Sequence, residues 1–209
     1  MYIPSAFNEA RVAVLHDFLR RHDFATIVTA GKRGLIASHV PVVLIEGRGE
    51  LGTLQFHLAR PNEQCHDLAA GASVLAVFQG AHGYISPRWY KTALRVPTWN
   101  YLVVHATGTP RALDETQLRD HLDALVSAYE PRDGGWSPAA LPPEARRKLE
   151  QSIAGFEIEI TSLQGKWKLG QNRTREDREG AIDGLRQTKS HEAAQLANWM
   201  QEVMNATSR

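Results

Sequence analysis

Residues 24–58 read FATIVTAGKRGLIASHVPVVLIEGRGELGTLQFHL, a segment with the pattern of antiparallel strands. Apolar and β-branched runs alternate here with two short glycine-containing turns, GKRG at 31–34 and EGRG at 46–49. Such runs favour strands, and short turns make neighbouring strands pair antiparallel. The expected strands are 24–30, 35–45 and 51–58.

The rest of the chain adds further strands and several helices. Asp114 and Gln117 have the spacing of a capping box, and Thr174 and Ser190 also suit helix starts. Because strands and helices do not alternate regularly, a doubly wound parallel sheet is not expected. The sequence predicts an α+β protein, a β-barrel of six or seven antiparallel strands with mainly C-terminal helices. The further expected strands are 73–79, 99–109 and 156–160, and the expected helices are 61–70, 114–129, 143–153, one from 174 and one from 190.

Composition indicates a globular protein. The 209 residues are 43% hydrophobic and 22% charged, with a net charge of +1. The single cysteine, Cys65, excludes an intramolecular disulfide and fits a reducing compartment. The longest apolar run, 74–78, is far shorter than the ~20 residues of a membrane-spanning helix. We therefore expect a cytoplasmic protein without a signal peptide, a membrane segment or a membrane partner.

Charge is unevenly distributed along the chain. No Asp or Glu occurs between Leu68 and Leu113, whereas Arg88, Lys91 and Arg95 fall in an expected loop within that segment. A surface rich in cations and poor in carboxylates attracts an anionic ligand. The alternative is that the segment is mostly buried strand, where acids are rare in any protein.

Several kinds of site are absent from the sequence. It contains no Gly-rich nucleotide loop, no His-Glu-x-x-His and no cysteine pair with zinc spacing, so no metal site is expected. Cys65 is interpreted as a small apolar residue rather than a nucleophile. No catalytic residue can be assigned, although His57, His82 and His105 are possible general bases.

Two polar motifs lie in neighbouring strands. Ser38-His39-Val40-Pro41 is in the second strand, and His57-Leu58-Ala59-Arg60-Pro61-Asn62 follows the third. With a helix starting near Pro61, Arg60 would lie at a helix N-terminus, which offers free N–H groups. Together with a hydroxyl and imidazoles, this arrangement predicts a phosphate site. The alternative is a structural corner with an exposed arginine.

Two other motifs combine aromatic and polar side chains. Residues 84–90, YISPRWY, and 96–101, VPTWNY, concentrate aromatic residues in an expected loop and at the start of the strand that follows it, which is typical of stacking surfaces or subunit interfaces. Residues 166–173, KWKLGQNR, place cations and amides at a strand end. The alternatives are the edge of the core for the aromatic motifs and a solvated strand end for the third.

Taken together, these motifs resemble the PaiB-type family of FMN-binding negative transcriptional regulators. Residues 1–7, MYIPSAF, and 22–26, HDFAT, resemble the same family, so the likeness covers about residues 1–173. The family usually has Lys-Leu-Ser-Gln-Asn where this chain has KLGQN at 168–172, so Gly170 replaces a hydroxyl near the ligand. Pro61 stands where an alanine is often found.

The resemblance implies an FMN-binding split barrel over 1–173 with a helical extension over 174–209. It also implies a homodimer with FMN at the subunit interface. By position, Ser38, His39, His57 and Arg60 would hold the phosphate and ribityl chain, with Asn62 in the same motif. Thr98, Trp99 and Asn100 would approach the flavin ring, and Lys168 and Gln171 would close the site.

The residues leave the function itself open. The alternatives to a regulator are a flavin-dependent oxidoreductase acting on a small molecule, a haem-handling split barrel, and a dimeric barrel with a degenerate ligand site. For DNA, the helices give weak support, because residues 190–206 contain no Lys or Arg. The surface near Arg88, Lys91 and Arg95 is the better DNA-binding hypothesis.

Overall fold

The computed structural model describes residues 1–32, 34–93, 96–131, 133 and 135–206. Arg33 of the first predicted turn and Arg95 of the predicted cationic surface lie outside these residues. The chain divides into two compact units. Unit 1 comprises 1–11, 79–104 and 164–209, and unit 2 comprises 12–78 and 105–163.

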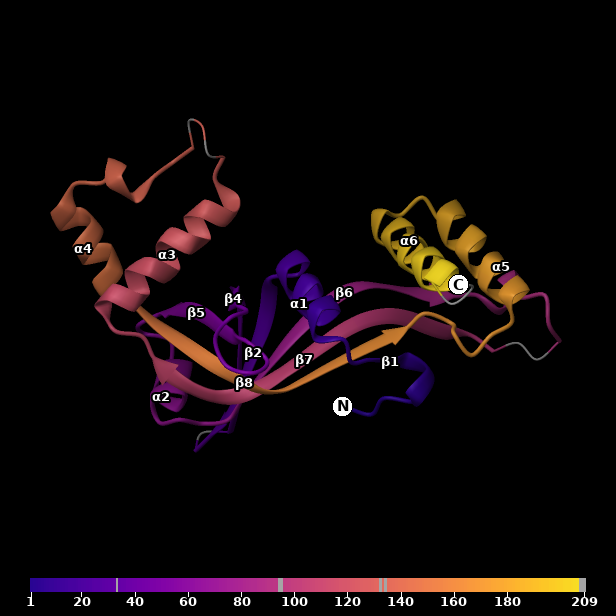
Figure 1. Ribbon diagram of the computed structural model, residues 1–209, viewed down its shortest axis with the longest axis horizontal. Coiled ribbons are helices and arrows are strands. Elements are labelled where there is room, and N and C mark those ends of the chain that lie inside the picture. The colour runs from indigo at the N-terminus through magenta and orange to yellow at the C-terminus, as the bar shows by residue number, and fades with distance from the viewer. Residues whose placement is uncertain (33, 94–95, 132, 134, 207–209) are drawn as a thin grey trace. The chain divides into compact units, whose positions relative to one another are not determined.

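Eight strands of the described residues form one sheet (Figure 1). Its order is β3-β2-β6-β7-β8-β5-β4, and β1 (Asn8–Glu9) pairs with β8 (Ile153–Lys168). The predicted pairing across the first turn is confirmed, since β2 (Phe24–Gly31) runs antiparallel to β3 (Gly34–Pro41) with Thr26 opposite His39. Because β3 and β4 are at opposite ends of this order, the sheet is open, as in a split rather than a closed barrel.

The single strand predicted over 35–45 is wrong, because it is two strands. After β3 the chain begins β4 (Val43–Ile45), which pairs with β5 (Thr53–Ala59) instead of β2. Pro41 has no N–H for a ladder, and the N–H of Val42 donates to the carbonyl of Asp23 at 2.8 Å. Because of this change of partner, β3 and β4 lie at opposite ends of the strand order.

Three strands are longer than predicted. They are β6 (Val74–Ile85), β7 (Thr98–Ala112) and β8, and residues of each belong to both units. The glycines at 80 and 83 favour a loop in the sequence, yet the ladder continues past both of them. Strand pairing across long sequence separations therefore outweighs local propensity here.

The described residues of unit 2 form four α-helices, one of which was not predicted. Helix α1 (Val12–Arg21) buries Leu15, Phe18 and Leu19, a spacing that places them on one face. Helix α3 (Glu115–Tyr129) begins with the predicted capping box, in which Asp114 accepts from the N–H of Gln117. The remaining helices are α2 (Gln64–Ala69) and α4 (Pro143–Gln151).

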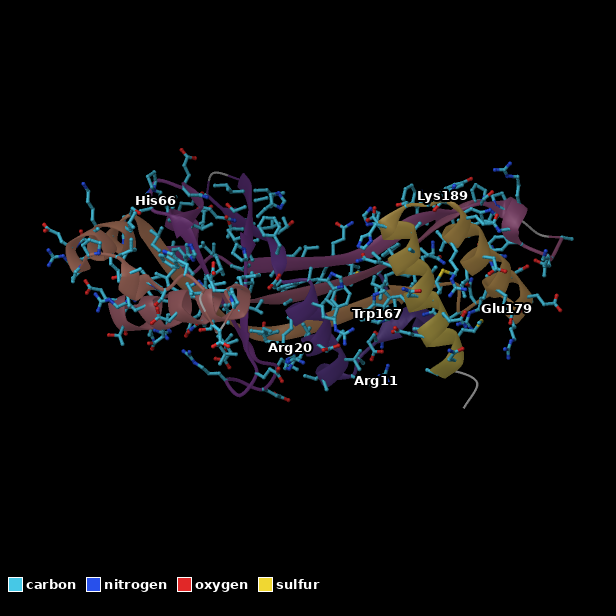
Figure 2. The ribbon with its side chains drawn as sticks, turned by 90° about the horizontal axis from the view of Figure 1, so that it is seen from above. Arg11, Arg20, His66, Trp167, Glu179 and Lys189 are labelled. Atoms are coloured by element: carbon cyan, nitrogen blue, oxygen red, sulfur yellow. The ribbon has the colours of Figure 1, made fainter. Side chains whose placement is uncertain are left out.

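Unit 1 ends in two helices that pack together, α5 (Arg175–Gln187) and α6 (His191–Ala206). Thr174 caps α5 as predicted, with its hydroxyl accepting from the N–H of Asp177. Between the helices, Lys189 adopts φ 54°, and Figure 2 shows it at that turn, with Glu179 on α5. The boundary between a domain over 1–173 and an extension over 174–209 stays a prediction. By compactness, the two helices belong to the same unit as residues 79–104.

Candidate functional site

The two polar motifs of unit 2 meet at one corner. Asn62 donates through Nδ2 to the Ser38 hydroxyl at 3.0 Å, and its Oδ1 accepts from the N–H of Gln64 at 2.9 Å. Helix α2 has Glu63 as its N-cap and begins at Gln64, three residues later than the sequence predicts, and it has only six residues. Asn62 therefore fixes the turn after β5 against β3 and places Ser38 beside it.

His39 extends this corner along an exposed strand. Its Nδ1 lies 3.0 Å from the hydroxyl of Thr26 on β2, which orients the ring, and the side chain is exposed. Leu35 on β3 and Phe24 on β2 are 77% and 66% exposed. Phe24 is opposite Pro41 and Leu35 is opposite Ala30, so the two exposed side chains lie near opposite ends of the β2–β3 pair.

Arg60 is used mainly to hold the backbone. Its Nε and Nη2 donate to the carbonyls of Gln151 at 2.9 Å and Ile153 at 2.8 Å. Its own N–H donates to the carbonyl of Ser152 at 2.8 Å. These carbonyls stand where α4 ends and β8 begins, so Arg60 satisfies the last acceptors of α4. The helix predicted over 61–70 begins only at Gln64, so Arg60 lies four residues before its first residue rather than beside its N-terminus.

His57 is paired with a histidine that sequence analysis missed. His57 Nδ1 lies 3.1 Å from Nε2 of His121, which is 1% exposed on α3. Burial and the neighbouring His57 lower the pKa of His121 to about 4, and burial lowers the pKa of His57. His121 lies three residues after the buried Leu118, so its place on the inner face of α3 is the signal that could have identified it.

In unit 1, two lysines meet tyrosine rings. Lys168 Nζ donates to the hydroxyl of Thr98 at 2.5 Å and lies 6.0 Å from the ring of Tyr101. Lys166 Nζ is 5.4 Å from the same ring and 5.6 Å from that of Tyr2. Burial is the main reason that the pKa of Lys168 is lowered, and the neighbouring Lys166 adds to the effect. The result is a cationic and aromatic surface on β7 and β8.

The other residues predicted to contact the flavin ring differ in how much of the side chain is exposed or free to bind a ligand. Trp99 is 54% exposed, whereas Asn100 is 2% exposed and donates to the Met200 sulfur at 3.4 Å. Gln171 folds back on its own turn, accepting from the N–H of Leu169 and donating to the carbonyl of Trp167. Trp99 can therefore meet a ligand directly, while Asn100 and Gln171 shape the surface behind it.

Gly170 is explained by backbone conformation. Its φ is +81°, a region that favours glycine. A Cβ there would lie 3.7 Å from both Asn100 Nδ2 and Arg178 Cγ, so a side chain has room but the backbone would be strained. The replacement of the usual serine therefore has a conformational reason beside the lost hydroxyl.

Comparison with known proteins gives the family. Residues 1–162 match the family described as "Putative FMN-binding domain". The chain belongs to this FMN-binding domain family. The protease synthase and sporulation protein PAI 2 of Bacillus subtilis (strain 168) is 32% identical over 205 residues, which cover 98% of each chain. The resemblance drawn from the motifs is confirmed.

Solved structures support the fold. The FAD and heme binding protein from Mycobacterium smegmatis has a TM-score of 0.62 at 18% identity, over 78% of this chain and 74% of that one. The flavocytochrome Anf3 from Azotobacter vinelandii has 0.63 at 14% identity, over 83% and 75%. The predicted fold class, an antiparallel split barrel with C-terminal helices, is confirmed. Within the described residues, no helix is long and apolar enough to span a membrane.

The chain belongs to an FMN-binding domain family, and its polar and aromatic side chains match the chemical groups of FMN. FMN presents an anionic phosphate, ribityl hydroxyls and a flat ring. The unit 2 corner offers the Ser38 hydroxyl and the exposed His39 imidazole, which suit the phosphate end. The unit 1 surface offers the Lys168 ammonium and the exposed Trp99 ring, which suit the ring end.

Two of the possible general bases, His82 and His105, and the cysteine Cys65 are held by an ion pair or by burial. His82 Nδ1 lies 2.8 Å from Glu192 Oε1, and His105 is half-buried with a lowered pKa, caused mainly by burial. Burial raises the pKa of the Cys65 thiol, which makes it a weaker nucleophile at neutral pH. Among the described residues, no group of three or more His, Cys, Asp or Glu side chains has the arrangement of a metal site.

Proposed function

We propose that the chain forms a homodimeric FMN-binding regulator, with FMN at the subunit interface. Unit 2 of one subunit holds the phosphate and ribityl chain, and unit 1 of the partner subunit meets the flavin ring. The observation that carries this proposal is the hydrogen bond from Asn62 to Ser38, which joins the two phosphate-side motifs. The phosphate-side residues are Ser38, His39, His57, Arg60 and Asn62, and the ring-side residues are Thr98, Trp99, Asn100, Lys168 and Gln171.

The exposed edge supports a dimer. Leu35 and Phe24 would be removed from water by a partner subunit, and the burial of apolar surface favours association. A two-fold arrangement uses the same surface of both subunits and builds two equal sites. We also place the protein in the cytoplasm, since its one cysteine suits a reducing compartment.

The first experiment is the absorption spectrum of the purified full-length protein, followed by identification of any released chromophore. We expect the visible bands of oxidised flavin and about one FMN for each subunit. His39→Ala should weaken FMN binding about tenfold, through loss of one hydrogen bond to a charged group. His191→Ala, at an exposed histidine of α6, is the control. A protein that stays colourless with added FMN would contradict the proposal.

Direct contact with DNA is the part of the regulator proposal with least support. Arg88 and Lys91 line a hollow that also contains Glu176, Glu179 and Asp183, so cations and carboxylates are mixed there. Arg95, the third residue of that hypothesis, lies outside the described residues. An electrophoretic shift that Arg88→Glu with Lys91→Glu abolishes would support this surface, and an unchanged shift would exclude it.

A further inference from the structure

Unit 1 contains a pocket that the FMN proposal leaves largely unused. Its volume is about 630 Å³, within the range of about 300–1,000 Å³ typical of small-molecule sites. One wall is segment 82–89 with Trp99, and the other is formed by the end of α5 and the start of α6. The helical wall lies after residue 162, where the match to the FMN-binding family ends.

The wall around Trp89 is fixed before any ligand arrives. Ser86 accepts from the N–H of Arg88 at 3.3 Å and caps the short 3₁₀ turn η2 (Pro87–Trp89). The indole of Trp89 lies so close to Gly184 of α5 that a Cβ there would be 2.2 Å from the ring. Such preorganisation reduces the entropy cost of binding.

Two aromatic rings of this pocket are exposed to solvent. Trp99 is 54% and Tyr84 is 46% exposed, although both line a hollow. Their centroids are 6.2 Å apart and the ring planes meet at 71°, an edge-to-face contact. Large exposed rings in a hollow can stack on a flat ligand, and stacking contributes beyond the area that it buries.

The charged side chains that line the pocket are His82, Glu192 and Arg88, and Arg88 also lines the neighbouring hollow that contains Glu176, Glu179 and Asp183. The pocket lining contains one carboxylate, Glu192, which pairs with His82 at 2.8 Å. Among the described residues, the exposed Arg88 forms no ion pair within 4.0 Å. A guanidinium binds a carboxylate through two parallel hydrogen bonds. The pocket is therefore complementary to an aromatic ring that carries a negative group.

We propose that this pocket binds a flat aromatic carboxylate, with its ring against Trp99 and Tyr84 and its carboxylate at Arg88. This inference rests on the proposed function at one residue only: Trp99, which lines the pocket, is also a proposed contact of the flavin ring. The variants chosen as tests therefore leave Trp99 unchanged.

The test is calorimetric titration of the full-length protein with 2-naphthoate, and with neutral 2-naphthamide as the matched probe. We expect Arg88→Gln to weaken naphthoate binding at least about tenfold, since it removes a charge-assisted hydrogen-bond pair. Tyr84→Leu should weaken it about fivefold through lost stacking. Arg186→Gln, an exposed arginine of α5 outside the pocket lining, should leave it unchanged.

Flavin content separates this inference from the proposed function. Visible flavin absorbance for each subunit, measured on the same samples, should be equal in Arg88→Gln and the parent protein. Naphthoate binding by a protein that holds no FMN would support the pocket and contradict the FMN site. Absence of naphthoate binding, or equal affinity for naphthoate and naphthamide in both the parent and Arg88→Gln, would overturn the aromatic-carboxylate proposal.

Discussion

Trp89 lies directly against Gly184, and a Cβ at position 184 would come within 2.2 Å of its indole ring. One turn earlier on α5, a Cβ at Gly180 would be 2.1 Å from the Trp89 carbonyl oxygen. The two glycines thus form a groove on α5 that receives η2. This close approach builds one wall of the pocket in unit 1.

Gly184→Ala should destabilise the protein by about 1–3 kcal/mol, the usual cost of overpacking. Elsewhere in a helix, Gly→Ala stabilises by about 1 kcal/mol, so the two effects have opposite signs. Urea unfolding followed by tryptophan fluorescence measures the change. Asp183→Ala, an exposed position of the same helix, is the control. A Gly184→Ala protein more stable than the parent would show that Trp89 moves away at no cost.

The His57–His121 pair should make stability depend on pH. The pKa of His121 is lowered to about 4, so its contribution is complete above its unfolded pKa of about 6.5. It decreases as the pH falls toward 4, because the unfolded chain takes up a proton that the folded chain resists. We expect a loss of about 2 kcal/mol between about pH 7.5 and 5.

His121→Phe should remove most of this pH dependence, measured as the free energy of unfolding from urea curves at each pH. His191→Ala, at an exposed histidine, should keep it. Equal slopes in the parent and His121→Phe would show that other groups cause the effect.

Glu157 is a buried carboxylate held by three donors. Arg48 and Arg111 approach it at 2.7 and 2.6 Å, and Gln55 donates at 3.1 Å. These partners outweigh burial and lower its pKa, so its contribution is present above the unfolded pKa and is lost as the pH falls through the lower folded pKa. Both arginines are about half exposed, and water weakens the pairing.

Glu157→Gln should therefore lower the free energy of unfolding at neutral pH by about 2 kcal/mol. Chemical denaturation of the variant beside Glu159→Gln, an exposed acid of the same strand, measures the effect. A similar loss in both variants would mean that the network around Glu157 adds little.

Gly170→Ala and Gly170→Ser should each lower the free energy of unfolding by about 1 kcal/mol, because φ is +81° at this position. Thermal unfolding monitored by circular dichroism is sufficient to detect this. Gly47→Ala, where a Cβ meets nothing within 4 Å, should have little effect. Unchanged midpoints for both position-170 variants would remove the conformational explanation for this glycine.

Local signals predicted the elements that depend on neighbouring residues. The capping box at Asp114 and Gln117 and the cap at Thr174 have the expected geometry. The lengths of β6, β7 and β8 depend on pairing between distant segments, which local patterns do not contain. For the same reason, local patterns predicted β3 and β4 as one strand.

The polar corner shows the same division. Ser38 and Asn62 are in contact, as expected, but the expected reason is wrong: β3 and β5 do not pair in the sheet, and Asn62 reaches Ser38 from the turn after β5. The partners of Arg60 are 91 and 93 residues away in sequence, and His121 is 64 residues from His57. Nothing in the local sequence assigns either contact, and the role of Arg60 and His57 at a ligand stays a prediction.

Arg60 has a consequence for motion within unit 2. Through one side chain and one amide it joins the end of β5 to residues 151–153, between α4 and β8. Separating these segments breaks all three bonds and also the pairing of β5 with β8, in which Ala59 is opposite Ile153. Their amide protons should therefore exchange with solvent at a common rate, as one cooperative opening unit rather than as independent chain ends.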